Sequence, residues 1–178
     1  MSIFKKIKRT LDFEMWKRKK DDKTTLDLDS PLTFKVGSVG EIFDDEFENL
    51  GQVRYEWGGG MWDECLLEMK DGKKKWLLVD EPRFILFNEE IFIPAGNINN
   101  GWNLINNRKI FVESKRKTTA TNTAGYAEVK VGTDVQCYDG YDEGKNFISI
   151  REYLGKYEKN TVLRTGRKIS RFEIEIYG

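Results

Sequence analysis

The amino-acid sequence predicts a mainly β protein: an antiparallel β-sandwich or a barrel-like pair of related halves, preceded by one N-terminal amphipathic helix. Two observations predict the strands. From residue 32 onward, apolar side chains recur with a period of two, and Gly, Asn and Asp separate these runs at intervals of about ten residues. A third observation is that no helical pattern separates successive strands, which favours an antiparallel fold over an α/β fold.

The helix is predicted over residues 2–16, and we assign residues 1–20 to it. Ser2 can cap its N-terminus, and an apolar stripe at helical spacing contains Ile3, Phe4, Ile7, Leu11 and Met15. Residues 21–31 are polar, end at Pro31 and are predicted to be a linker.

The apolar stripe of this helix needs a cover, because an isolated helix of this length is marginally stable in water. Three covers are possible: the parent domain, a second copy of the chain, or an anionic membrane surface that residues 2–20 would contact through their basic side chains. Asp12 and Glu14 dilute the positive charge, so we expect packing on protein.

Residues 32–178 are predicted to form the β-rich domain, with halves at about 32–93 and 108–178. A loop rich in Asn and Gly, 94–107, connects the halves. In the last strand we expect Phe172, Ile174 and Ile176 to face inward. The first half contains predicted strands at 32–37, 51–57, 61–69, 75–80 and 83–93.

One short pattern occurs in both halves. "TFKVGSVG" at 33–40 and "EVKVGTDV" at 128–135 share a Lys-Val-Gly core. A duplicated strand-turn unit would explain the likeness, and so would chance in a chain rich in β-branched residues.

Composition excludes several kinds of site. The chain has no histidine, which removes the commonest general base and zinc ligand and every Ser-His or Cys-His pair. Cys65 and Cys137 form no CxxC motif; we expect both to be buried thiols in a cytoplasmic protein, although one disulfide between them stays possible. No stretch approaches 18 apolar residues and no export signal is evident.

Charge is balanced overall but uneven along the chain. Lys and Arg total 30, as do Asp and Glu. Residues 1–23 contain nine basic and four acidic side chains, whereas 40–90 contain fourteen acidic and six basic ones. The basic runs at 17–20 and 114–117 lack interleaved aromatic residues apart from Trp16, so we expect solvated charges and no nucleic-acid site.

The stretch "YEWGGGMWDECLL" at 55–67 is the one candidate site. If 51–57 and 61–69 pair as strands, Gly58–Gly60 form the reversal, where glycine supplies the positive φ of hairpin turns. Two interpretations follow: a structural hairpin, or a binding surface of Trp57, Trp62 and Glu64 together with Asp63. The cost of burying Glu64 unpaired favours an outward Trp62 face.

Several of these motifs together resemble a bacterial family, domain-of-unknown-function family 4178. They are "FKVGSVGEI", "LGQVRYEW", "MWDECLLEMKDGKKKWLLVDEPRFILF" and, in the second half, "GYAEVKVGTDVQCYDGYDEG" with "FISIREY". The likeness covers roughly residues 32–177, and the chain departs from the family at Cys65, where Tyr is usual, and at Tyr126, where Glu is usual. The resemblance implies a β-rich fold without an assigned activity. It also implies a partner role, because domains of this family tend to be encoded near membrane-associated scaffold and stress-response proteins.

Enzyme interpretations find little support in the sequence. Asp63 and Glu64 are adjacent in a predicted strand and would point to opposite faces, and Asp139 with Asp142 fits an ordinary turn. The acidic run at 43–48 lacks the spacing of a calcium loop. We therefore expect no catalytic residues, metal or cofactor, and a cytoplasmic binding or adaptor module with a protein partner. The alternatives are a neutralising protein of the immunity type and, more remotely, a carbohydrate-active hydrolase.

Overall fold

The computed structural model describes residues 34–155 and 159–177. These form eleven strands and one short 3-10 helix, with no α-helix among the described residues. The elements are β1 Val39–Ile42, β2 Asp45–Trp57, β3 Gly60–Met69, β4 Lys74–Asp80, β5 Arg83–Ile93, β6 Gly101–Ile105, β7 Arg108–Gly125, β8 Asp134–Asp142, β9 Phe147–Leu154, β10 Lys159–Ile169, η1 Arg171–Glu173 and β11 Ile174–Ile176. The prediction of a mainly antiparallel β protein is confirmed; the helix predicted at 2–16 and the linker at 21–31 lie outside the described residues.

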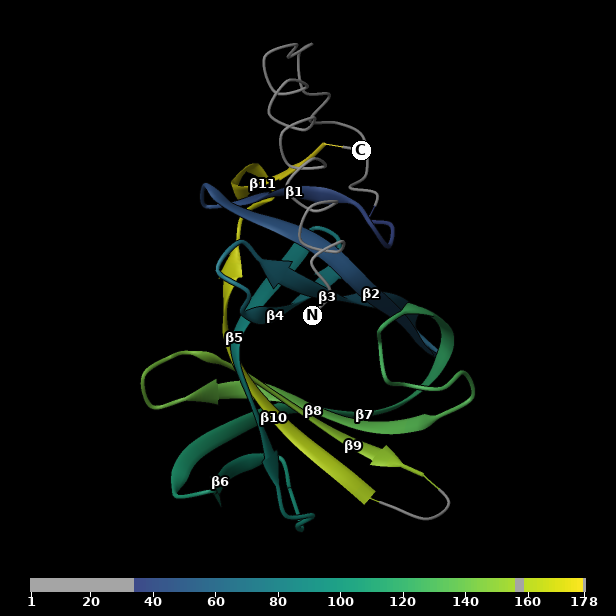
Figure 1. Ribbon diagram of the computed structural model, residues 1–178. Coiled ribbons are helices and arrows are strands. Elements are labelled where there is room, and N and C mark those ends of the chain that lie inside the picture. The colour runs from purple at the N-terminus through teal and green to yellow at the C-terminus, as the bar shows by residue number, and fades with distance from the viewer. Residues whose placement is uncertain (1–33, 156–158, 178) are drawn as a thin grey trace.

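Eight of the strands close into a barrel. The sheet runs in the order β11-β1-β2-β3-β4-β5-β10-β9-β8-β7-β6, and an additional pairing of β2 with β7 closes the circle. Every pairing is antiparallel. Strands from both predicted halves therefore share one barrel wall (Figure 1).

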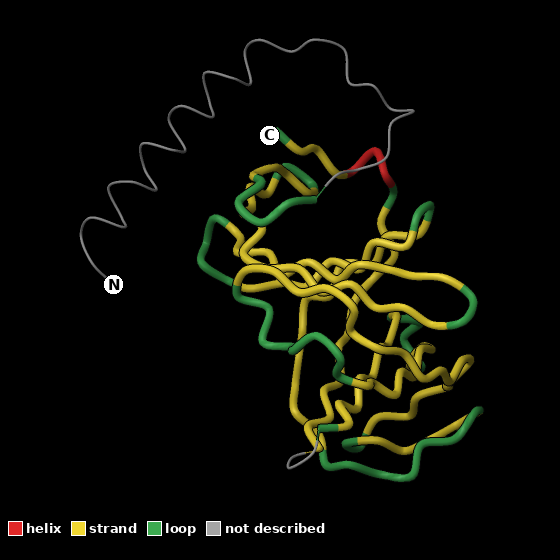
Figure 2. The backbone as a smooth tube through the Cα atoms, turned by 90° about the vertical axis from the view of Figure 1, so that its right-hand side faces the viewer, coloured by secondary structure: helices red, strands yellow, loops and turns green. Residues whose placement is uncertain are grey.

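The seam of the barrel lies where β2 and β7 each exchange partners. One stretch of β2 pairs with β1 through Glu48, and the following stretch pairs with β7 from Gly51. On β7, residues up to Val112 pair with β6, whereas those from Thr119 pair with β2. The flaps β11–β1 and β6 thus extend from the barrel at opposite ends of the strand order (Figures 1 and 2).

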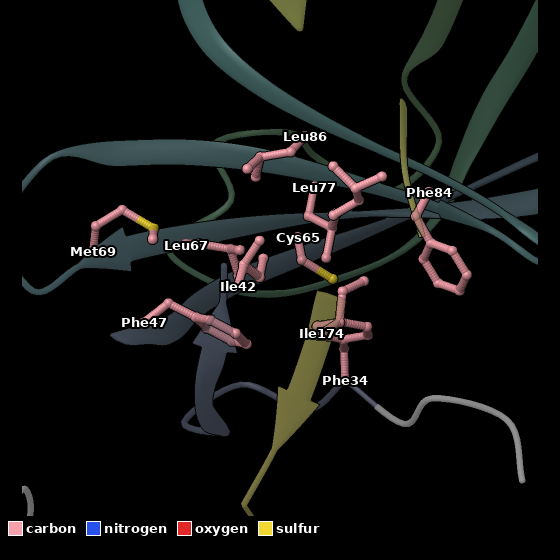
Figure 3. Packing of buried hydrophobic residues seen from close by; sticks show 11 residues of the cluster. Phe34, Ile42, Phe47, Cys65, Leu67, Met69, Leu77, Phe84, Leu86 and Ile174 are labelled. Carbon is pink, nitrogen blue, oxygen red and sulfur yellow. The ribbon is translucent and has the colours of Figure 1, made fainter. Parts of the chain in front are cut away.

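Three apolar clusters follow from this arrangement because both faces of the barrel wall are covered. One fills part of the barrel interior and includes Val53, Leu78 and Phe87. Another lies between the outer face of β3–β5 and the β1–β11 flap, with Phe47, Cys65 and Leu67 (Figure 3). The last lies on the outer face of the second half, where Ile98 from the 94–100 connection covers β7–β10; its other members include Ile110, Tyr138, Ile150 and Leu163.

Strands β3, β4 and β5 lie close to their predicted positions, whereas β2 begins at Asp45, before the predicted strand at 51–57. Both chain ends of the domain also differ from the prediction. Residues predicted as a strand at 32–37 include, from 34 on, an irregular segment and a turn before β1. In 171–177, Ser170 and Glu173 form a capping box that starts the 3-10 helix η1. Phe172 is consequently 74% exposed, and the prediction that it faces inward is wrong.

The predicted loop at 94–107 contains a strand, β6, at 101–105.

The Lys-Val-Gly pattern that occurs in both halves adopts the same local structure in each. In each copy the glycine has a left-handed φ, +86° at Gly37 and +84° at Gly132. The following residue donates its amide to the lysine carbonyl three positions back, Ser38 to Lys35 and Thr133 to Lys130. Each turn leads into a strand, β1 or β8, but among the described residues no strand directly precedes either turn, so the shared unit is a turn followed by a strand.

Candidate functional site

Alternation along four barrel strands places an ionic cluster inside the barrel. Glu64 of β3 accepts hydrogen bonds on its two carboxylate oxygens, from Arg151 Nε at 3.1 Å and from Arg164 Nη1. Arg151 also reaches Asp139 of β8 at 2.9 Å. Glu64, Arg151 and Arg164 are each at most 2% exposed, so three charged side chains form a buried core that joins β3, β9 and β10.

The cluster continues outward through two further residues. Arg164 Nε donates to Glu90 of β5. Arg116 of β7 donates to Asp139 at 3.2 Å. These pairs balance the charge, because three arginines face three carboxylates: Arg116, Arg151 and Arg164 against Glu64, Glu90 and Asp139. Balanced, hydrogen-bonded charges are the form in which ions are tolerated in a protein interior.

The electrostatics of the cluster fix its protonation state. Burial acts to raise the pKa of Glu64, but the charges of Arg151 and Arg164 and hydrogen bonds from Arg164 and Trp62 lower that pKa to about 2. Burial acts to lower the pKa of Arg151 and Arg164, yet the facing carboxylates, with other neighbouring groups, raise both above the usual arginine value. All three side chains are ionised near neutral pH.

Aromatic rings enclose the arginines. The guanidinium carbon of Arg164 lies 4.2 Å from the ring centre of Trp76. Arg116 lies 5.3 Å from the ring of Trp57 and 5.6 Å from that of Trp62, and Arg151 also lies 5.6 Å from Trp62. These distances are within cation–π range, so the rings add attraction while they exclude water.

The structure brings the predicted site residues together, but inside the barrel. Trp62 is 4% exposed and Glu64 fully buried, and the indole Nε1 of Trp62 donates to Glu64 at 3.1 Å. The expectation that Trp62 faces outward is wrong because Glu64 is not unpaired: two arginines from distant strands neutralise it. Trp57 packs on Trp62, with ring centres 5.2 Å apart.

Two of the three glycines at 58–60, Gly59 and Gly60, make room for Trp57. Of the three, only Gly60 has a positive φ, +157°, so Gly58 and Gly59 do not follow the prediction of a positive-φ turn. A Cβ on Gly59 would lie 2.6 Å from the indole Nε1 of Trp57, and one on Gly60 would lie 3.0 Å from its ring. The indole thus folds back over the turn, and no side chain fits beneath it.

Sequence reasoning missed Arg151 and Arg164, the residues that define the cluster. Each is a lone arginine at an inward position of a strand, in "SIREY" and "VLRTG". An arginine on a solvent-exposed strand face would give the same local sequence pattern. The available signal was a charge complementarity between these arginines and Glu64, but the sequence does not show locally that β3 faces β9 and β10 across the barrel interior.

One end of the barrel opens into a pocket of about 720 Å³. Its wall includes four inward side chains of the barrel strands, Leu66, Trp76, Tyr153 and Val162. The segment 125–130 and Thr133, before β8, cover one side. Trp76 connects this pocket to the ionic cluster, because the same indole lines the pocket and contacts Arg164.

Large apolar side chains stand at the rim of this pocket. Phe92 is 77% exposed and Tyr126 is 68% exposed. Charged side chains at the rim are Lys74, Glu128 and Lys130. Pockets of 300–1,000 Å³ with mainly apolar walls and a few polar groups are typical ligand sites.

The described residues offer no evident catalytic group. Asp63 and Glu64 lie on opposite faces of β3, and Asp63 pairs with Arg54 through two 2.9 Å hydrogen bonds. Asp142 pairs with Arg108 at 2.8 Å. Burial raises the pKa of both Cys65 and Cys137, which makes the thiols poor nucleophiles. Among described residues, no group of three or more potential ligands gathers for a metal, and no helix is long and apolar enough to cross a membrane.

Comparison with known proteins identifies a family and no individual relative. A family model described as "Domain of unknown function (DUF4178)" matches residues 35–171. That range includes β1 through β10 and all members of the ionic cluster, and it confirms the resemblance drawn from the sequence motifs. No curated protein matches the chain. No solved structure matches it.

Proposed function

This chain belongs to the DUF4178 family, whose description assigns no activity, and we propose from its geometry that it is a non-enzymatic binding module. The pocket at the barrel end is the proposed site. Its ligand is a large apolar or aromatic side chain of a protein partner. The observation that carries the proposal is a pocket of about 720 Å³ whose wall includes Trp76, Tyr153 and Val162.

The ionic cluster supports binding over turnover. A general acid or base must exchange a proton near the working pH. Glu64, with a pKa of about 2, stays ionised, and the arginines stay protonated. We interpret the cluster as a rigid floor that holds Trp76 in place, since a pre-organised wall reduces the entropy lost on binding.

The rim favours a protein ligand over a small apolar molecule. Phe92 and Tyr126 project beyond the pocket and are mostly exposed, so they can contact surface around an inserted side chain. Aromatic anchors in a pocket with a polar rim are the usual centre of a protein interface. The proposal places the module in the cytoplasm, where two unpaired thiols such as Cys65 and Cys137 persist. Association with membrane-linked scaffold proteins stays a prediction.

The alternative functions rest on features that the structure does not favour. A neutralising protein would use an exposed acidic, aromatic face, but Trp62 and Glu64 are buried. A glycoside hydrolase needs two carboxylates facing one substrate, whereas Asp63 and Glu64 lie on opposite sides of the barrel wall and are each paired with arginine.

Quantitative capture from the native cell tests the proposal. The tagged full chain is compared with Phe92→Asp, which places a charge at the rim, and with Val162→Trp, which fills part of the pocket from its wall. Phe172→Asp is the matched control because Phe172 is equally exposed, at 74%, but lies on η1 outside the pocket. Circular dichroism and thermal unfolding establish that each variant is folded.

We expect partners that the wild type and Phe172→Asp capture alike and that both pocket variants lose at least tenfold. Capture of the same proteins by all four chains would contradict the proposal. A partner that Phe92→Asp still captures and Phe172→Asp does not would also contradict the proposal.

A further inference from the structure

The two ends of the sheet order are protected very differently. At one end, β11 has only three residues and contains Glu175, with Glu173 just before it. At the other end, β6 has the sequence GWNLI, without a charge or a proline. Within the described chain β6 pairs only with β7. Natural edge strands are usually short, charged or interrupted, because an unprotected edge pairs with another strand.

Exposed apolar side chains accompany this edge. Trp102 is 60% and Leu104 is 72% exposed, and both lie on one face of β6. On the same face, cross-strand pairing aligns Trp102 with Phe111 of β7 and Phe111 with Tyr141 of β8. Their ring centres lie 5.3 Å apart at each step. An aromatic row thus spans β8, β7 and β6 and ends at the β6 edge, where the part of the chain that the structure describes leaves Trp102 mostly exposed.

We propose that this edge pairs with β6 of a second copy of the chain, antiparallel and centred on Asn103, to form a symmetric dimer. In that register Trp102 faces Leu104 of the other copy, and Leu104 faces its Trp102. Gly101 faces Ile105 in the same way. The aromatic row of each copy then continues onto the Leu104 of the other, and no like charges meet.

The sequence of β6 favours a second copy of the chain as the partner. A two-fold interface requires a patch that is complementary to itself, and a large ring opposite a branched aliphatic side chain satisfies this on both sides of the axis. Strand addition at an open edge supplies main-chain hydrogen bonds as well. The β11 edge offers no such match, because Glu175 would face an acidic residue of the second copy.

The area that this pairing can bury is small. A fully covered aromatic side chain buries roughly 150–250 Å², and Trp102 and Leu104 are already partly covered, so together they contribute at most on the order of 250 Å² per copy. That places the interface at the low end of specific complexes. The dimer is therefore weak and depends on concentration.

Sedimentation equilibrium of the full chain, from about 1 μM to several hundred μM, tests the proposal. The wild type should dimerise within this range. Trp102→Lys and Leu104→Glu should each weaken association at least tenfold. Phe172→Lys, at an equally exposed position beside the other sheet edge, should leave it unchanged. Circular dichroism verifies that each variant is folded.

A mixture of two variants tests the register. In the proposed pairing, Trp102→Lys on one copy faces Leu104→Glu on the other, so the mixed sample should associate more tightly than either variant alone. A wild type that stays monomeric throughout would overturn the proposal. So would dimerisation that survives both β6 variants, or mixed variants that fail to associate better than each does separately.

Discussion

At the scale of single residues, Glu64 determines how the barrel interior is organised. It is fully buried and receives hydrogen bonds from Trp62, Arg151 and Arg164. Its neighbour Asp63 has the same kind of charge and also pairs with an arginine, yet it faces the outside of the barrel, and Arg54 is 40% exposed. Adjacent residues in one strand therefore provide a direct comparison of a buried and a surface ion pair.

We expect Glu64→Gln to lower the free energy of unfolding by roughly 3–5 kcal/mol. The change leaves Arg151 and Arg164 without their common counter-charge in a dry interior, and breaking a buried pair in this way is costly. Asp63→Asn should cost less than about 1 kcal/mol, because water solvates Arg54 when its partner is lost. Urea unfolding of the two variants measures both quantities. Equal losses would show that the interior cluster is hydrated.

The low pKa of Glu64 predicts a specific pH dependence. In the unfolded chain this carboxylate takes up a proton near its ordinary pKa of 4.5, whereas in the folded protein it stays charged until about pH 2. Because the folded pKa is depressed, the contribution is complete above pH 4.5 and disappears as the pH falls toward 2. Its size is roughly 3 kcal/mol, at about 1.4 kcal/mol for each pH unit.

Carboxyl NMR titration of Glu64 measures this pKa directly, and acid unfolding of the wild type against Glu64→Gln measures its consequence. The wild type should lose stability more steeply than the variant between pH 4.5 and 2. A titration midpoint at or above 4.5 would mean that the arginines do not outweigh the effect of burial.

At the scale of elements, the sequence predicts the positions of strands such as β3 and β5 more accurately than it predicts which of their side chains are buried. The period-two runs at 83–93 and 61–69 coincide closely with β5 and β3, since alternation reports a pleated strand. In β3, however, Trp62 and Glu64 lie inside the barrel while Cys65 and Leu67 lie in the outer cluster. Alternation cannot reveal that both faces of a strand are covered, because that depends on flaps from distant parts of the chain.

The misassigned elements have local physical causes. In 171–177 the alternation is regular, but the capping box of Ser170 and Glu173 satisfies backbone amides and starts a 3-10 turn instead of a strand. β6 lies in a stretch rich in Asn and Gly that reads as a loop. Its pairing with β7 supplies the hydrogen bonds that make it a strand.

The β2–β3 turn provides a prediction at this scale. Gly59→Ala should lower the free energy of unfolding by roughly 1–2 kcal/mol, because its Cβ would displace the Trp57 indole and disturb the packing of Trp57 on Trp62. Gly58→Ala should lie within about 0.5 kcal/mol of the wild type, since a Cβ there meets nothing within 4 Å. Guanidinium unfolding compares the pair, and a loss from Gly58→Ala as large as that from Gly59→Ala would assign the effect to the turn backbone.

At the scale of the whole molecule, closure links parts of the chain that are far apart in sequence. The seam joins β2 to β7, and the ionic cluster joins β3 to β8, β9 and β10. The buried aromatic and aliphatic residues of both halves fill one interior. No barrel strand can separate without breaking two ladders, so we expect the barrel to open as a unit.

The two cysteines report separately on the two sides of the barrel wall. Cys65 lies in the outer cluster beneath β1 and β11, and Cys137 lies in the interior cluster. Both are at most 1% exposed, and a thiol reagent such as Ellman's reagent reaches them only through an opening of the structure. With Cys65→Ala and Cys137→Ala, each thiol can be followed alone.

If the barrel and its outer flap form one cooperative unit, the opening free energy obtained from each labelling rate should equal the free energy of global unfolding of the same variant, within about 1 kcal/mol. Comparison within each variant removes the effect of the substitution on stability. The opposite result has a definite structural meaning. If the opening free energy is much smaller for Cys65 than for Cys137, the β1–β11 flap detaches while the barrel stays closed. The reason is that Phe34, Ile42 and Ile174, which pack in the cluster with Cys65, belong to this flap and to the segment that precedes β1. Equal opening free energies would require the flap to keep its contacts with Phe47 and Leu67 until the β2–β7 pairing itself opens.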